Sequence, residues 1–152
     1  MIDPDVATVN LLVGENKVGK PIFEEVPVEP VDGSAGVRVL ATPGMVLNIA
    51  AGDVIELNPA DGTFTTLTRG GNVGAHVFAE HAVVDRYIEE IEAAGGRLDG
   101  RADGLSTFTV PYGPGVVALE GIFNQMVEAD SEVEWYFSNV FADDGTPLNW
   151  WL

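Results

Sequence analysis

The sequence predicts an α+β fold in which a β-rich N-terminal part is followed by a ferredoxin-like C-terminal part. Between residues 8 and 67, short apolar and β-branched runs alternate with Gly, Pro and Asp and show no helical period. Residues 80–94 and 114–126 instead repeat apolar side chains every three or four positions, which predicts amphipathic helices. The pair Gly70-Gly71 separates the two patterns.

The N-terminal part is expected to be a small curled β-sheet or a partly open barrel, because several short strands follow one another closely. The prolines at 21 and 27 exclude a helix interior, since proline lacks the backbone N–H. Asp61-Gly62 predicts a hairpin turn. The expected strands are Thr8–Val13, Pro21–Val28, Val37–Leu40, Gly52–Leu57 and Thr63–Leu67.

The C-terminal part is expected to follow the order strand, helix, strand, strand, helix, strand, which is the split βαβ, ferredoxin-like arrangement. Both helices would cover one face of a four-stranded sheet and leave its other face free. We therefore expect a β-rich subdomain at residues 1–71 and a ferredoxin-like α+β subdomain at 72–152. The expected elements are Val73–Phe78, Glu80–Ala94, Arg97–Asp99, Leu105–Val110, a helix from Pro114, and Glu132–Val140.

Acidic residues dominate the composition: 24 Asp and Glu stand against 7 Lys and Arg, giving a net charge of −17 on 152 residues. Residues 1–71 hold ten acids and four bases, whereas residues 72–152 hold fourteen acids and three bases. Such a charge repels nucleic acids and anionic membranes, and favours either a cationic partner or solubility alone. No nucleic-acid or membrane partner is expected.

The sequence contains no cysteine, which excludes disulfides, thiolate catalysis and cysteine-ligated metal sites. It has no apolar run of 18 residues, and its first residues lack both a basic stretch and an apolar stretch. We therefore expect no signal peptide and no membrane span, and a cytoplasmic location.

One segment, Gly14–Lys20, fits the phosphate-loop pattern G-x-x-x-x-G-K directly after an expected strand. A working phosphate loop continues with Ser or Thr and then a helix, whose N-terminus faces the phosphates. Here Pro21 follows and the next segment is extended. The sequence therefore favours a hairpin turn that carries two lysines.

Histidine chemistry is the second candidate, because His81 and Asp85 stand at i and i+4 of an expected helix. With His76 on the preceding strand, these side chains could in principle hold a divalent metal. The competing interpretation is a satisfied strand histidine and a partly exposed one at the helix start. No H-E-x-x-H or G-x-S-x-G motif accompanies them. We therefore predict no enzyme, no catalytic residue, no metal and no cofactor.

The C-terminal segment Asn149–Leu152 contains two adjacent tryptophans, which rarely stay free in water. They either dock on the chain's own sheet or anchor a partner, since aromatic residues are favoured at interface centres. Tyr136, next to Glu134 on an expected sheet face, adds a second possible contact. The candidate aromatic anchors are Tyr136, Trp150 and Trp151.

The segment Ala41–Leu57 resembles an uncharacterised bacterial family, numbered 4265 among domains of unknown function. The matching pieces are Thr42-Pro43, Ile49–Val54, and Asp85–Gly96 followed by Leu98-Asp99-Gly100. The resemblance covers most of residues 20–140. Where members often show a Ser-Gly-His-Ser-like stretch, this chain has Gly70–His76. The resemblance implies a fold and no reaction.

The leading functional hypothesis is a non-enzymatic, acidic protein-binding module, most concretely an immunity or antitoxin-type protein that neutralises a basic toxin domain. Complementary charge would speed its association with a cationic partner. The alternatives are a small-molecule-sensing regulatory domain and, less favoured, a histidine-dependent enzyme, while acidity for solubility alone competes with all of them. The oligomeric state is left open. The expected contact surface comprises Glu80, Asp85, Glu89, Glu92, Glu128, Asp130, Glu132 and Glu134.

Overall fold

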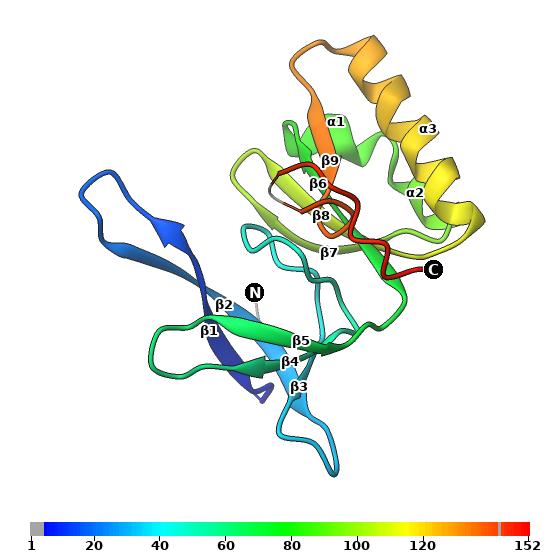
Figure 1. Ribbon diagram of the computed structural model, residues 1–152. Coiled ribbons are helices and arrows are strands. Elements are labelled where there is room, and N and C mark those ends of the chain that lie inside the picture. The colour runs from blue at the N-terminus through cyan, green and yellow to red at the C-terminus, as the bar shows by residue number, and fades with distance from the viewer. Residues whose placement is uncertain (1–4, 143) are drawn as a thin grey trace.

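The computed structural model describes residues 5–142 and 144–152 and contains two antiparallel sheets and three helices, so the predicted α+β class is confirmed (Figure 1). The first sheet has the strand order β1-β2-β3-β4-β5, and the second has the order β7-β8-β6-β9. Strands of the first sheet are β1 (Thr8–Glu15), β2 (Pro21–Pro30), β3 (Val37–Val39), β4 (Val54–Leu57) and β5 (Phe64–Thr68).

Successive antiparallel pairings build the first sheet, and β1 and β5 form its two edges, so the sheet does not close into a barrel. The segment Gly14–Lys20 is the turn of the β1–β2 hairpin, as predicted. Its Asn16 side-chain oxygen accepts hydrogen bonds from the backbone N–H groups of Val18 and Lys20. Strand β2 follows this turn where a phosphate loop needs a helix.

The second sheet and its helices follow the predicted order of elements. They are β6 (Asn72–Phe78), α1 (His81–Asp85), α2 (Ile88–Ala93), β7 (Arg97–Ala102), β8 (Leu105–Pro111), α3 (Pro114–Ala129) and β9 (Glu134–Phe137). The helices pack on one face of this sheet, where Val73, Ala75 and Val77 of β6 meet Ile91 of α2 and Phe123 of α3. This alternation along β6 sends the residues between them to the opposite face.

The predicted helix Glu80–Ala94 is in fact two short helices, α1 and α2, with a turn at Arg86-Tyr87. The N–H of Tyr87 bonds to the carbonyl of Val84, three residues back, so the chain tightens there. Val84 before the turn and Ile91 after it are both fully buried. The turn thus directs both helices onto the same core.

The prediction that the second face of this sheet stays free is wrong. Residues 41–53, which connect β3 to β4, lie between the two sheets and pack against that face (Figure 1, cyan to teal). The face carries polar side chains, among them His76 and Thr109, and both are buried. Buried polar groups need hydrogen-bond partners. The connecting segment supplies them with its backbone N–H and carbonyl groups, which apolar side chains packed on this face could not do.

Gly74 of β6 marks the closest approach of the two halves. A Cβ atom at Gly74 would lie 2.5 Å from the side chains of both Thr42 and Ser138. Real Cβ atoms do not come this close, so the connecting segment lies directly on the strand because residue 74 has no side chain.

We predict that Gly74→Ala lowers the free energy of unfolding by about 1–3 kcal/mol, because the added methyl group overpacks a buried contact. Gly100→Ala in β7 is the matched control, since its Cβ meets no atom within 4 Å. Urea unfolding of both variants measures the difference. Equal stability of the two would contradict the tight contact.

Candidate functional site

The hydrogen bonds between residues 41–53 and the second sheet form a continuous polar layer, here called the seam. A chain of donors and acceptors runs through it from the loop to β7. Ala51 N–H donates to Thr42 Oγ1 (3.1 Å), and Thr109 Oγ1 donates to the Asp99 carboxylate (2.5 Å). Since the Thr109 proton is used on Asp99, Thr42 must be the donor in the 2.6 Å contact between the two hydroxyls.

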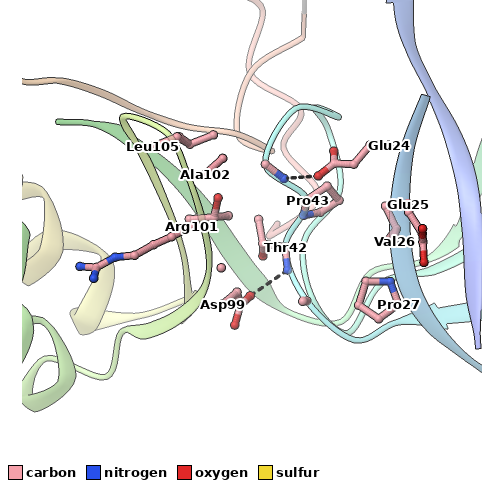
Figure 2. A pocket seen from close by; sticks show the side chains of 14 residues that line it. Glu24, Glu25, Val26, Pro27, Thr42, Pro43, Asp99, Arg101, Ala102 and Leu105 are labelled. Atoms are coloured by element: carbon pink, nitrogen blue, oxygen red, sulfur yellow. Dashed lines mark hydrogen bonds between the residues drawn. The ribbon is translucent and has the colours of Figure 1, made fainter. Parts of the chain in front are cut away.

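Asp99 is the end point of this chain and joins three segments. One of its carboxylate oxygens also accepts the Thr42 backbone N–H (2.8 Å), and the other accepts Arg97 Nε (2.6 Å). Figure 2 shows the Asp99 carboxylate directed at the Thr42 backbone. The carboxylate is thus occupied by the loop, by β8 and by its own strand, and it serves to hold them together.

His76 of β6 is fully buried at the centre of the seam. Its Nε2 lies 2.7 Å from the carbonyl oxygen of Pro43, and its Nδ1 lies 3.0 Å from the hydroxyl of Tyr136. A carbonyl can only accept, so Nε2 carries the proton and Nδ1 accepts from Tyr136. Burial lowers the pKa of His76, against smaller opposing effects of the Pro43 hydrogen bond and the Glu24 charge. The imidazole is therefore neutral and structural.

Glu24 of β2 holds the other side of the connecting segment. Its carboxylate accepts backbone N–H groups of Gly44 (2.8 Å), Met45 (2.9 Å) and Val46 (3.0 Å). Between β2 and β7 lies a pocket of about 240 Å³, and Figure 2 shows Glu24 and Asp99 reaching the loop from opposite sides of it. Arg101, also drawn in Figure 2, points away from the loop toward Asp85.

A second group of buried contacts fixes the far end of the connecting segment. Asp53 accepts the backbone N–H groups of Ala50 and Gly70 and pairs with Arg69 at 3.1 Å. The Asn72 side chain donates to the carbonyl of Ala51 (2.7 Å), and Asn139, after β9, donates to the carbonyl of Asn72. Gly52-Asp53, within the Ile49–Val54 motif, is thus part of a turn that the Asp53 carboxylate closes by accepting the Ala50 N–H.

The carboxylates of Asp99 and Glu24 and the imidazole of His76 thus all bond to backbone or side-chain groups of the fold. His81 and Asp85 do not pair with each other: His81 Nε2 lies 2.7 Å from the carbonyl of Ala102, and Asp85 binds Arg101 at 2.6 Å. Within residues 5–142 and 144–152, no group of three His, Asp or Glu is arranged to hold a metal ion.

The acidic residues predicted to form a contact surface lie on α1, α2, the end of α3 and the start of β9, here called the acidic layer. Seven of the eight are exposed and Asp130 is half-buried. Among the described residues, Asp85 is the one of the eight that forms an ion pair. The exposed Arg86 lies next to it in sequence and between the two helices. Within the described residues, the other seven therefore form no ion pair, and Glu134, in register with Phe78, lies on the face of β9 opposite the helices.

The predicted aromatic anchors have three different environments. Trp150 packs on the second core and donates its indole N–H to the carbonyl of Asn139 (2.8 Å), as expected for a docked tail. Trp151 stacks on Tyr112, with ring centroids 6.0 Å apart and an interplanar angle of 20°. Tyr136 is 43% exposed and bonds to His76. The tail therefore packs on the core of the second sheet through Trp150, while Trp151 is half-buried against Tyr112.

Sequence reasoning missed the seam, although it singled out Thr42-Pro43, Gly52-Asp53, His76 and Asp99 for other reasons. A signal was present in the alternation along β8, where Thr107 and Thr109 alternate with Phe108 and Val110. A strand whose two faces are both buried, one apolar and one polar, indicates a polar partner on the second face.

No described helix is long and apolar enough to cross a membrane.

The chain belongs to the family described as "Domain of unknown function (DUF4265)", whose model matches residues 24–135. This match confirms the resemblance noted in the sequence. A solved structure, "Novel crystal structure of a hypothetical protein from Neisseria gonorrhoeae", is similar with a TM-score of 0.64 and 12% sequence identity. The similarity covers 90% of this chain and 96% of that one, and it shows a shared fold. No curated protein matches the chain.

The lowered pKa of His76 predicts a pH-dependent stability. Its ordinary value is 6.5, so below about pH 6.5 the unfolded chain binds more protons at this residue than the folded chain does. The folded state therefore loses stability as the pH falls from 6.5 toward the lowered pKa, by at most about 1.4 kcal/mol per pH unit.

The control is His76→Gln, which retains a donor and an acceptor but does not titrate. Urea unfolding of both proteins at about pH 7.5 and about pH 5.5 cancels the contribution of the many carboxylates, which the two share. We expect the wild type to lose more stability than the variant on acidification. If the difference in unfolding free energy between wild type and His76→Gln is the same at both pH values, the folded state accepts a proton at His76 without cost, which contradicts the prediction.

Proposed function

We propose that this protein is a non-enzymatic binding module for a basic protein, and that the acidic layer is its contact surface. The observation that carries the proposal is the excess of acids in this layer, whose neighbouring bases are Arg86, between α1 and α2, and Arg101, paired with Asp85. Arg69 and Arg97 pair with Asp53 and Asp99 in the seam, and Lys17 and Lys20 lie at the tip of the β1–β2 hairpin. The acidic layer therefore keeps most of its carboxylates unneutralised.

Exposed carboxylates that repel one another lower the stability of a fold. A cationic surface that covers them relieves this repulsion, so it makes the binding free energy more favourable. They also accelerate encounter with a basic partner, an effect that weakens as salt screens the charges. Negative charges in the first turn of α2, Glu89 and Glu90, are tolerated because they lie near the positive end of the helix. The layer can thus be strongly acidic without disrupting its helices.

In its most specific form, the proposal describes an immunity or antitoxin-type protein that covers a basic toxin domain. We also propose that residues 72–152 form a ferredoxin-like subdomain and that residues 1–71 form a separate β-rich one. The order β7-β8-β6-β9 with both helical segments on one face supports the former. The seam supports treating the two halves as one rigid unit that presents the acidic layer to the partner.

The test compares two variants from which four negative charges are removed in different places. One carries Glu89→Gln, Glu92→Gln, Glu128→Gln and Glu132→Gln in the acidic layer. The matched control carries Glu15→Gln, Glu25→Gln, Asp32→Asn and Glu56→Gln, all exposed on the first half. Each protein is immobilised, exposed to extract of the source cell at low salt, and the retained proteins are identified.

We expect the wild type and the control to retain the same basic protein. The acidic-layer variant should bind it about tenfold more weakly or worse, from the sum of four screened charge interactions. Equal retention by both variants would contradict the placement of the surface. Failure of the wild type to retain a basic protein, with thermal stabilisation by a small metabolite, would favour a small-molecule sensor that uses the pocket between β2 and β7.

A further inference from the structure

A groove of about 410 Å³ lies between α3, β9 and the C-terminal tail, on the helical side of the second sheet. Its walls are strongly aromatic, with rings from the turn before α3, from β9 and from the C-terminal tail: Tyr112, Trp135, Phe137, Phe141 and Trp151. Tyr112 and Phe141 are 52% and 51% exposed, so the groove is open to solvent. A solvent-open concave surface lined by aromatic rings is the kind of surface that small apolar or cationic groups bind.

The groove also contains one acid. Of its described lining residues, Glu120 of α3 carries the charge, and the remaining ones are apolar or aromatic. Val116 lies one turn before Glu120 on the same helix, and Val140 faces them from the segment after β9. An apolar groove that has one carboxylate in its lining suits a ligand with an aliphatic stem and a positive end.

Aromatic faces attract cations, and this tail already holds one. The Arg69 guanidinium lies 5.9 Å from the ring of Trp150, which is itself 5.4 Å from the ring of Trp151. Arg69 is neutralised by Asp53, so it does not repel a second cation strongly. Trp151 and Tyr112 stack on each other, and the outer face of the exposed Tyr112 ring offers the same attraction to an incoming group.

We propose that this groove receives a lysine side chain of the basic partner, with the stem along Val116 and Val140 and the ammonium between the aromatic faces and Glu120. This inference rests on the proposed function and deepens it. The acidic layer supplies long-range attraction with little specificity, whereas the groove supplies a defined position for one side chain. Charge complementarity selects lysine over an apolar residue, since the protein carries a net charge of −17.

The test uses small probes of the intact protein, so it does not depend on finding the partner. The probes are Nα-acetyl-lysine methylamide, its uncharged analogue from norleucine, and its anionic counterpart from glutamate. Binding is followed by the NMR signals of the indole N–H groups of Trp135, Trp150 and Trp151. We expect saturable shifts for Trp135 and Trp151, with the lysine probe bound roughly two- to fivefold more tightly than the norleucine probe.

Variants assign the binding to the groove. Glu120→Gln should remove the preference for lysine over norleucine, and Trp151→Leu should weaken binding of both. Phe23→Leu, which changes an exposed aromatic residue in the first half, is the control and should leave the shifts unchanged. Thermal unfolding and near-UV circular dichroism verify that each variant is folded. Equal affinity for the two probes, or shifts that persist unchanged in Trp151→Leu, would overturn the proposal.

The outcome is separable from that of the proposed function. If the acidic-layer variant loses the basic partner but Trp151→Leu retains it at full affinity, the groove proposal fails and the proposed function stands. If the lysine probe binds as expected but the wild type retains no basic protein, the groove binds a cation and the proposed function fails.

Discussion

The rest of the structure depends on the hydrogen bonds that seat residues 41–53 on the polar face of the second sheet. His76 Nε2–H reaches the Pro43 carbonyl, Asp99 takes the Thr42 N–H, and Glu24 holds the next three backbone positions from the other side. Each of these groups is costly to bury without its partner. The seam therefore fixes the relation between two sheets that share few apolar contacts, because their cores are separate clusters.

Much of the fold could be predicted from the sequence, because its elements follow from local patterns. Period-two and helical alternation located every strand and α3 to within a few residues, and the order of strands and helices gave the α+β class. The break at Arg86-Tyr87 could not be predicted, since Val84, Tyr87, Ile88 and Ile91 have the spacing of one continuous helix. Tertiary packing decided between one helix and two.

The seam could not be predicted because it is made of contacts between residues far apart in the chain. His76 bonds to Pro43, and Asp99 to Thr42, across separations of 33 and 57 residues. Neither half shows by itself that a polar strand face will be covered. The exposure of the acidic residues could be predicted, since exposed charges on helices follow from composition and periodicity. Its groove was not, because three segments must fold together before the aromatic rings meet.

The seam also narrows the choice of function. It covers one face of the second sheet, and Asp99, Glu24 and His76 form hydrogen bonds within it. The helical side remains accessible, with the acidic layer and the aromatic groove on α3 and β9, and so does the pocket between β2 and β7. A long-range negative field beside a shaped aromatic site is a combination suited to a cationic protein surface.

Hydrogen exchange of the protein in complex with the basic protein that it retains tests this account most directly. The account predicts slower exchange in α2, α3 and β9 on binding, and unchanged exchange in the β1–β2 hairpin and in residues 41–53. Protection centred on residues 41–53 or on the pocket beside Glu24, with the helical side unchanged, would contradict it.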